Sequence, residues 1–140
     1  MDTKQTEQLL RAWMAMEVCI RGNRLLQDLS MNEMLVCSAL YEQPMTATEL
    51  CARTRLLKSQ MNHILNDMEQ QGLIVRTRSS ADRRSVCVQL QDRDRYLREH
   101  ERVLRIVGAV GRELGSENTE TLTALMEQAA RIVSSYKEEL

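Results

Sequence analysis

The sequence has no phenylalanine, one proline and only two histidines among its 140 residues. The histidines, His63 and His100, are far apart, and the chain contains no glycine-rich phosphate loop, no His-Glu-x-x-His and no Cys-x-x-Cys motif. Catalysis and metal binding need clustered side chains of these types, and no set of metal ligands can be assembled from this sequence. We therefore expect neither an enzyme nor a metal or cofactor site.

Long apolar runs are also missing. No run approaches the roughly 18–20 apolar residues that a membrane-spanning helix needs. The N-terminal MDTKQTEQ lacks the basic-then-apolar pattern of a signal peptide. The four cysteines are scattered without paired spacing, which is typical of reduced thiols rather than of a disulfide framework. These absences predict a cytoplasmic protein with no membrane partner.

The net charge is small, at −1, but its distribution is uneven. Residues 46–91 hold seven Lys and Arg against four Asp and Glu, and residues 92–112 hold six against four. Residues 1–45 carry a net charge of −2, and residues 113–140 carry −4. A basic middle between acidic ends is expected when one face meets the phosphates of nucleic acid, although a solvated charged surface can have the same pattern.

The basic middle, residues 46–91, has the pattern helix, turn, helix, hairpin. Thr46 and Glu49 are spaced as a capping box, which predicts a helix start. After a break near residues 55–57, apolar residues return at helical spacing, at Met61, Ile64, Leu65 and Met68. Gly72 suits the left-handed residue that ends such a helix. The runs LIVRTR and VCVQLQ, separated by SSADRRS, then predict a two-stranded hairpin.

A further helix precedes this segment. Ser30 and Glu33 form a second capping box, and Pro44 ends the apolar series that follows it. Residues 30–91 are therefore expected to form a winged helix-turn-helix, and the fold class is mainly α with a small β part (α+β). The whole chain, 1–140, is the right length for a single domain.

Long helices are expected on both sides of the winged segment. Residues 5–29 carry an apolar stripe wider than one partner helix requires, and helices are also predicted at 92–114 and at about 119–138. A winged helix needs only part of the chain, so these surplus apolar helices, in 1–29 and 92–140, are expected to pair across a two-fold axis in a homodimer. The alternative is a larger helical core within one monomer.

The winged segment resembles the MarR family of bacterial transcription regulators. The resemblance lies in MEQQGLIVR at 68–76, in Asp82-Arg83-Arg84-Ser85-Val86 and in Val88-Gln89-Leu90. The family's wing carries Asp-x-Arg followed by alternating apolar residues, and Asp82 and Arg84 fall on that Asp and Arg. The helical layout fits over essentially all of the chain. The resemblance implies a dimeric regulator, more often a repressor, bound to a pseudo-palindromic operator on double-stranded DNA.

The second helix of a helix-turn-helix enters the major groove and reads base edges with its N-terminal half. With Met61, Ile64 and Leu65 facing inward, four side chains face outward: Ser59, Gln60, Asn62 and His63. Gln60 and Asn62 could each pair with adenine through two hydrogen bonds. Lys58 and Arg55, near the helix start, suit phosphates. Leu57 stands where family members often have a capping Asp or Ser, so this helix start lacks that cap.

The wing tip is rich in arginine. Arg78, Arg83 and Arg84 lie in or beside the turn, with Arg76 on the strand before it. Such a tip should lie over the DNA backbone and place an arginine in a narrow minor groove. The resemblance to the family implies that Arg84 is that arginine, and Asp82 would orient its guanidinium through a forked salt bridge. An incidental surface pair is the alternative.

The resemblance also raises the question of a signal. Many members of the family bind small aromatic anions in a cleft beside the dimer helices. Four residues could line such a cleft, although an apolar stripe at helical spacing is more often core: Trp13, Met14, Arg21 and Met31. Peroxide-sensing members carry a cysteine near the start of the first helix, but that place falls near Thr6 here. Cys19 lies more than three turns further on and is interpreted as buried and structural.

One rival function remains open on the sequence. A winged helix can serve as a protein-interaction module that never touches DNA. The basic wing argues against this alternative, because such a charge distribution has no evident use there.

Overall fold

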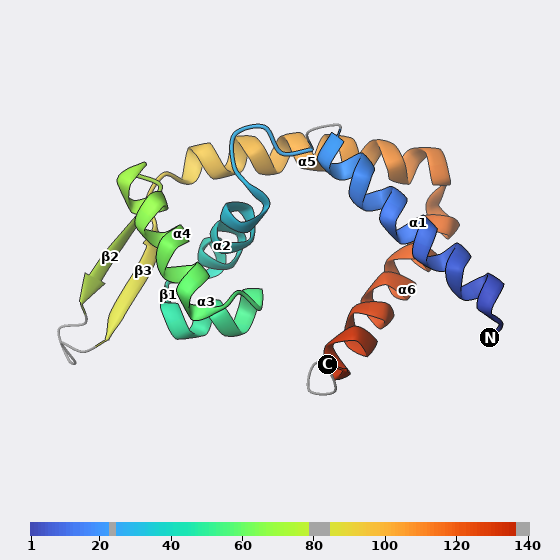
Figure 1. The fold of residues 1–140 in the computed structure, drawn as a ribbon. Coiled ribbons are helices and arrows are strands. Elements are labelled where there is room, and N and C mark those ends of the chain that lie inside the picture. The colour runs from blue at the N-terminus through green and yellow to red at the C-terminus, as the bar shows by residue number, and fades with distance from the viewer. Residues whose placement is uncertain (23–24, 79–84, 137–140) are drawn as a thin grey trace. The chain divides into compact units, whose positions relative to one another are not determined.

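The computed structural model describes residues 1–22, 25–78 and 85–136 (Figure 1). The chain divides into two compact units, Met1–Glu101 and Arg102–Leu140. The elements in chain order are α1 (Thr3–Gly22), α2 (Met31–Glu42), β1 (Met45–Thr46), α3 (Ala47–Thr54), α4 (Lys58–Gln70), β2 (Ile74–Arg78), β3 (Val86–Leu90), α5 (Arg93–Leu114) and α6 (Ser116–Ser135). Among the described helices, none combines the length and apolar character needed to cross a lipid bilayer.

Both predicted capping boxes are present. In α2, the Ser30 Oγ accepts from the Glu33 N–H (3.1 Å) and the Glu33 carboxylate accepts from the Ser30 N–H (2.9 Å). Thr46 and Glu49 make the same reciprocal pair at the start of α3. Each box satisfies two backbone donors that a helix start leaves without an intrahelical partner. Each of these two helix starts is thus fixed by a pair of residues that are three positions apart in the sequence.

The turn between α3 and α4 is built on a left-handed residue. Arg55 has φ 64° and ψ 16°, and its N–H donates to the Cys51 carbonyl (2.9 Å). Glycine is the usual residue at such a helix end, because a side chain there costs about 1–2 kcal/mol. The predicted break near residues 55–57 is confirmed. Gly72, with φ 73°, likewise ends α4 as predicted.

The sheet has one strand more than the sequence predicted. The hairpin of β2 and β3 is confirmed, with Ile74 opposite Leu90 and Arg78 opposite Val86. β1 pairs with the other edge of β3 through Met45 and Thr46, so the strand order is β1-β3-β2. A strand of two residues is too short to show the alternation by which strands are recognised in a sequence. The predicted hairpin is thus confirmed, and β1 is an additional strand that the sequence did not predict.

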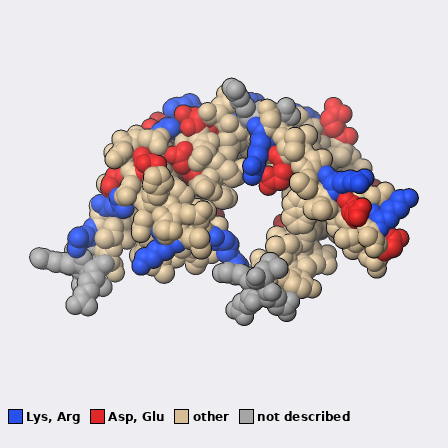
Figure 2. Space-filling model, viewed as in Figure 1, with Lys and Arg blue, Asp and Glu red and all other residues tan. Residues whose placement is uncertain are grey.

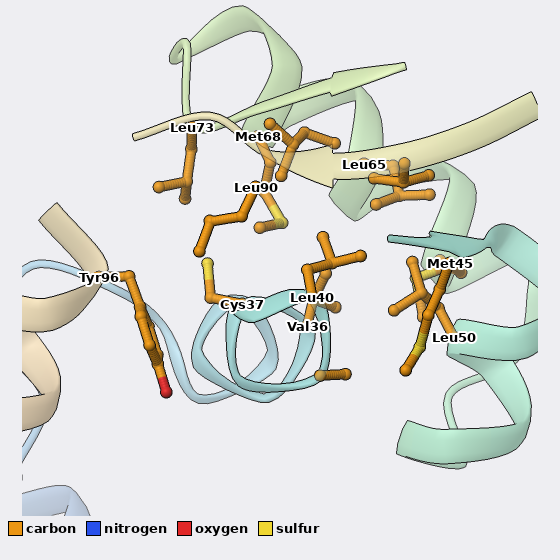
Figure 3. Close-up of a cluster of buried hydrophobic side chains, with 14 of the residues drawn as sticks. Val36, Cys37, Leu40, Met45, Leu50, Leu65, Met68, Leu73, Leu90 and Tyr96 are labelled. Carbon is orange, nitrogen blue, oxygen red and sulfur yellow. The ribbon is translucent and has the colours of Figure 1, made fainter. Parts of the chain in front are cut away.

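The core lies where α2, α3 and α4 meet the sheet. Figure 3 shows Val36, Cys37 and Leu40 of α2 facing side chains of α4 and of the hairpin. The largest fully buried side chains come from five elements and from the turn before β2: Leu50, Met61, Leu65, Met68, Leu73, Ile74, Val36, Val88 and Cys37. Tyr96, in the first turns of α5, closes one side of this core and is 3% exposed. Methionines occupy core places that phenylalanine often takes.

The first helix is shorter than expected. α1 ends at Gly22 instead of continuing to residue 29. The backbone N–H groups of residues 27, 28 and 29 donate to the carboxylate of Glu99, on α5, and Leu29 is buried in the core. These amides could not reach an external carboxylate while hydrogen-bonded within a helix. The long-range contact overrides the local apolar periodicity, so the predicted range 5–29 was wrong at its C-terminal end.

α5 and α6 are joined by Gly115, which has φ 86°. The Thr119 hydroxyl donates to the Gly111 carbonyl (3.1 Å) in this corner. α6 begins at Ser116, three residues earlier than predicted, and contains no buried residue among those described. The large apolar side chains of α6 and of Tyr136, which directly follows it, are 43–60% exposed: Leu122, Leu125, Met126, Ile132, Val133 and Tyr136. α1 likewise contains no buried residue and exposes an apolar stripe, which includes Leu9, Trp13 and Met16.

The cysteines differ in environment. Cys19 is exposed, which corrects the expectation that it is buried: α1, which carries it, buries none of its residues within the described chain. Cys37 is fully buried. Burial, followed by the nearby Glu33 carboxylate, raises the pKa of the Cys37 thiol to about 12.

The buried Cys37 thiol should make stability fall at alkaline pH. Its folded-state pKa of about 12 lies above the ordinary value of 9.0, so its contribution is complete below pH 9 and is lost as pH rises toward 12. We expect the difference in unfolding free energy between wild type and Cys37→Ala to shrink by about 2–3 kcal/mol between pH 9 and 11. Urea unfolding at several pH values measures this. A difference that stays constant would contradict the burial argument.

Candidate nucleic-acid interface

One face of α4 is buried and the opposite face is open. Met61, Leu65 and Met68 pack into the core, and Ile64 is half-buried beside them. The polar residues of the N-terminal half are all exposed, as predicted: Lys58, Ser59, Gln60, Asn62 and His63. The core holds α4 in one rotational setting, so the helix presents this polar face to solvent. His63 also lies 3.5 Å from Asp67, one helical turn further on.

The start of α4 is capped by Gln60, a residue expected from the sequence to contact a base. Leu57 is the N-cap residue and makes no side-chain cap hydrogen bond. The Gln60 Oε1 instead accepts the Leu57 N–H (3.0 Å). A pair of hydrogen bonds to adenine would need both the oxygen and the nitrogen of that amide. Gln60 therefore serves as a helix cap here, and its position three residues after the N-cap is a signal that the sequence already contained.

Basic residues flank the exposed face. Arg55 and Lys58 are exposed at the turn and at the start of α4. Figure 2 shows Lys and Arg side chains along the lower edge of the region of α3, α4 and β2, with Asp and Glu side chains above them. In this view the lower edge of this unit is thus basic. Such a charge distribution attracts phosphate.

The described part of the wing carries two of the predicted arginines. Arg76 and Arg78 are two residues apart on β2 and so share one face of the strand. Arg78 is exposed. Arg76 is held against α4, where its Nη2 donates to the Asn66 Oδ1 (2.5 Å) and to the Glu69 Oε1 (2.9 Å). Asp82, Arg83 and Arg84 lie outside the described residues, so their expected contacts stay predictions.

The residues predicted to line a ligand cleft are not brought together by any described contact. Trp13, Met14 and Met31 are 47–58% exposed, and Arg21 pairs with Glu17 along α1. A cavity of about 330 Å³ lies elsewhere, between the end of α2 and the start of α5. There the guanidinium carbon of Arg93 lies 4.6 Å from the centre of the Tyr41 ring. No group of three His, Cys, Asp or Glu within the described ranges could hold a metal ion.

Comparison with known proteins agrees with this fold. Residues 27–85 match the model of the MarR family. The chain is similar to the transcriptional regulator BldR from Sulfolobus solfataricus, at 28% identity and a TM-score of 0.68, over 96% of this chain and 99% of that one. It is also similar to the transcriptional repressor CouR bound to a 23-mer DNA duplex, at 26% identity and a TM-score of 0.68, over 91% of this chain and 89% of that one.

A further similar structure is that of NadR in complex with 4-hydroxyphenylacetate, at 25% identity and a TM-score of 0.66, over 89% of this chain and 91% of that one. No curated protein matches the chain. The winged helix-turn-helix, the exposed polar face of α4 and the family match point the same way. The chain is similar to the MarR family, and residues 27–85 are the part that matches the family's pattern.

Proposed function

We propose that the protein is a sequence-specific DNA-binding transcription regulator. The observation that carries this proposal is the exposed polar face of α4, held outward by a buried opposite face and flanked by basic residues. Ser59, Asn62 and His63 would read base edges in the major groove, and Arg55 and Lys58 would contact phosphates. The wing residues Arg78, Asp82, Arg83 and Arg84 would lie along the adjacent backbone and minor groove. CouR, a similar structure, is bound to a DNA duplex.

The acting species is a homodimer. Its support is the exposed apolar surface of α1 and α6, which no described part of the same chain buries. A second copy would cover these faces by two-fold symmetry. The dimer would then present two copies of α4 to half-sites one DNA turn apart, at about 34–36 Å. The operator should therefore be pseudo-palindromic.

The regulator is a cytoplasmic repressor that a small aromatic ligand releases from DNA. CouR is described as a repressor, and NadR was solved with 4-hydroxyphenylacetate. A ligand would act by preferring a dimer whose α4 helices have the wrong separation for DNA. Trp13, Met14, Arg21 and Met31 are the candidate lining. Trp13 is the only tryptophan, so its fluorescence would report aromatic acids that bind near α1.

The test is selection of binding sequences from randomised duplexes, followed by fluorescence-anisotropy titration of the selected duplex and a scrambled one at several salt concentrations. We expect a pseudo-palindrome with half-site centres about 10 base pairs apart, and affinity that falls steeply with salt. Asn62→Ala should keep the salt dependence but lose about 1–3 kcal/mol of preference at one base pair in each half-site. Weak binding without any enriched sequence would instead favour the protein-interaction module.

A further inference from the structure

Arg76 joins the wing to α4. Its side chain leaves the middle of β2, and its Nη2 donates to both Asn66 and Glu69, which lie one turn apart on α4. α4 and β2 pack on each other, and the Arg76 side chain is 26% exposed. The same hydrogen bond lowers the pKa of the Glu69 carboxyl below its ordinary value. These three residues are called the wing clamp below.

The wing clamp lies where a small rotation of the hairpin would displace the far end of the wing. The root of the hairpin is fixed, because Ile74 and Leu90 are paired and buried in the core. From that root a five-residue strand extends about 17 Å, so a swing of about 10° would move its far end by about 3 Å. The wing tip and the N-terminal half of α4 must fit neighbouring grooves at the same time. Displacements of that size would break one set of contacts.

We propose that Arg76 is a positioning residue, which holds the wing at the angle to α4 that DNA requires, and that it does not itself contact phosphate. This inference rests on the proposed DNA-binding function and replaces the expectation that Arg76 binds DNA directly. Its partner residues act with it: Glu69 is acidic and would weaken DNA binding by simple repulsion, yet in the clamp it supports binding. The two roles therefore predict opposite effects when Glu69 is removed.

The experiment measures affinity for the selected duplex against salt concentration in Arg76→Met, Arg76→Lys, Glu69→Ala and the double variant. Arg78→Met is the matched control, since it removes the same charge from the same face of the same strand. We expect Arg76→Met and Glu69→Ala each to weaken binding about fivefold, as for a partly exposed ion pair, without change in the salt slope. Arg78→Met should lower the magnitude of the slope by about 0.9.

The remaining variants separate the two roles of Arg76. Lysine keeps the charge, but its ammonium ends one bond short of the Nη2 nitrogen that donates to both partners, so Arg76→Lys should bind as weakly as Arg76→Met. The double variant should bind no more weakly than either single variant, because both remove one interaction. Tighter binding by Glu69→Ala, recovery by lysine, or a reduced slope in Arg76→Met would each overturn the clamp.

Failure of the proposed function would look different. In that case the wild-type chain itself enriches no duplex, and the wing clamp can then have no effect on DNA affinity. Amide hydrogen exchange then still tests whether the wing clamp restrains the β2–β3 hairpin. Glu69→Ala should speed exchange of the β2 and β3 amides relative to wild type, and unchanged rates would show that the contact does not restrain the wing.

Discussion

Replacing Glu99 by alanine is expected to lower the free energy of unfolding by about 3 kcal/mol, the largest effect on stability that we expect from any single polar residue. Glu99 is 3% exposed, and its carboxylate oxygens accept the N–H groups of Gln27 (3.2 Å), Asp28 (2.5 Å) and Leu29 (2.8 Å). Each donor left buried without a partner costs about 1–3 kcal/mol. The part-buried amides can recover water, so the total is less than three full penalties.

The measurement is urea unfolding of Glu99→Ala beside Glu101→Ala. Glu101 lies two residues further along α5 and is exposed, so its replacement removes the same charge without orphaning a donor. Glu99→Gln keeps the shape but turns an NH₂ group toward the amides, and it should lose at least half as much stability as the alanine variant. If Glu99→Ala unfolds within about 0.5 kcal/mol of the Glu101 control, the carboxylate does not hold this segment.

The contact of Glu99 with residues 27–29 also explains why the end of α1 could not be predicted from the sequence. The capping boxes at Ser30 and Thr46 and the left-handed Gly72 were predicted because each depends on residues a few positions apart. The end of α1 depends instead on a carboxylate about 70 residues away. A local apolar pattern extended to residue 29, but it carries no information on a partner so distant. The helix was therefore predicted to end seven residues too late.

The candidate site was predictable in outline and less so in the roles of its residues. Periodicity alone identified the outward face of α4, because the buried methionines and leucine fix the rotation of the helix. It did not identify Gln60 as a cap or Arg76 as a partner of Glu69. Gln60 lies three residues after Leu57, which is the spacing of a capping box. The same spacing had identified Thr46 and Glu49 as a capping box. The Arg76 contact joins a strand to a helix and has no local pattern.

Leu125→Asp is expected to turn a dimer into a monomer and to reduce affinity for the selected operator by a factor on the order of 10²–10⁴. Leu125 is 57% exposed within the single chain, so the change should leave the fold of the monomer nearly intact. In the proposed dimer the same side chain would lie between apolar partners, where an unpaired carboxylate is strongly disfavoured. The affinity loss would come from the second half-site, which a monomer cannot hold at high effective concentration.

Sedimentation velocity and anisotropy titration on the same samples separate the two consequences. The matched control is Ala124→Asp, one residue earlier and about 100° around the helix, which adds the same charge at an exposed position outside the apolar stripe. It should remain dimeric and bind the operator nearly as wild type does. Because Leu125 lies far along the chain from α4 and the wing, an affinity loss accompanied by dissociation must act through the second copy. A Leu125→Asp protein that stays dimeric, or a monomer that keeps full operator affinity, would contradict the proposal that α6 forms the dimer that reads DNA.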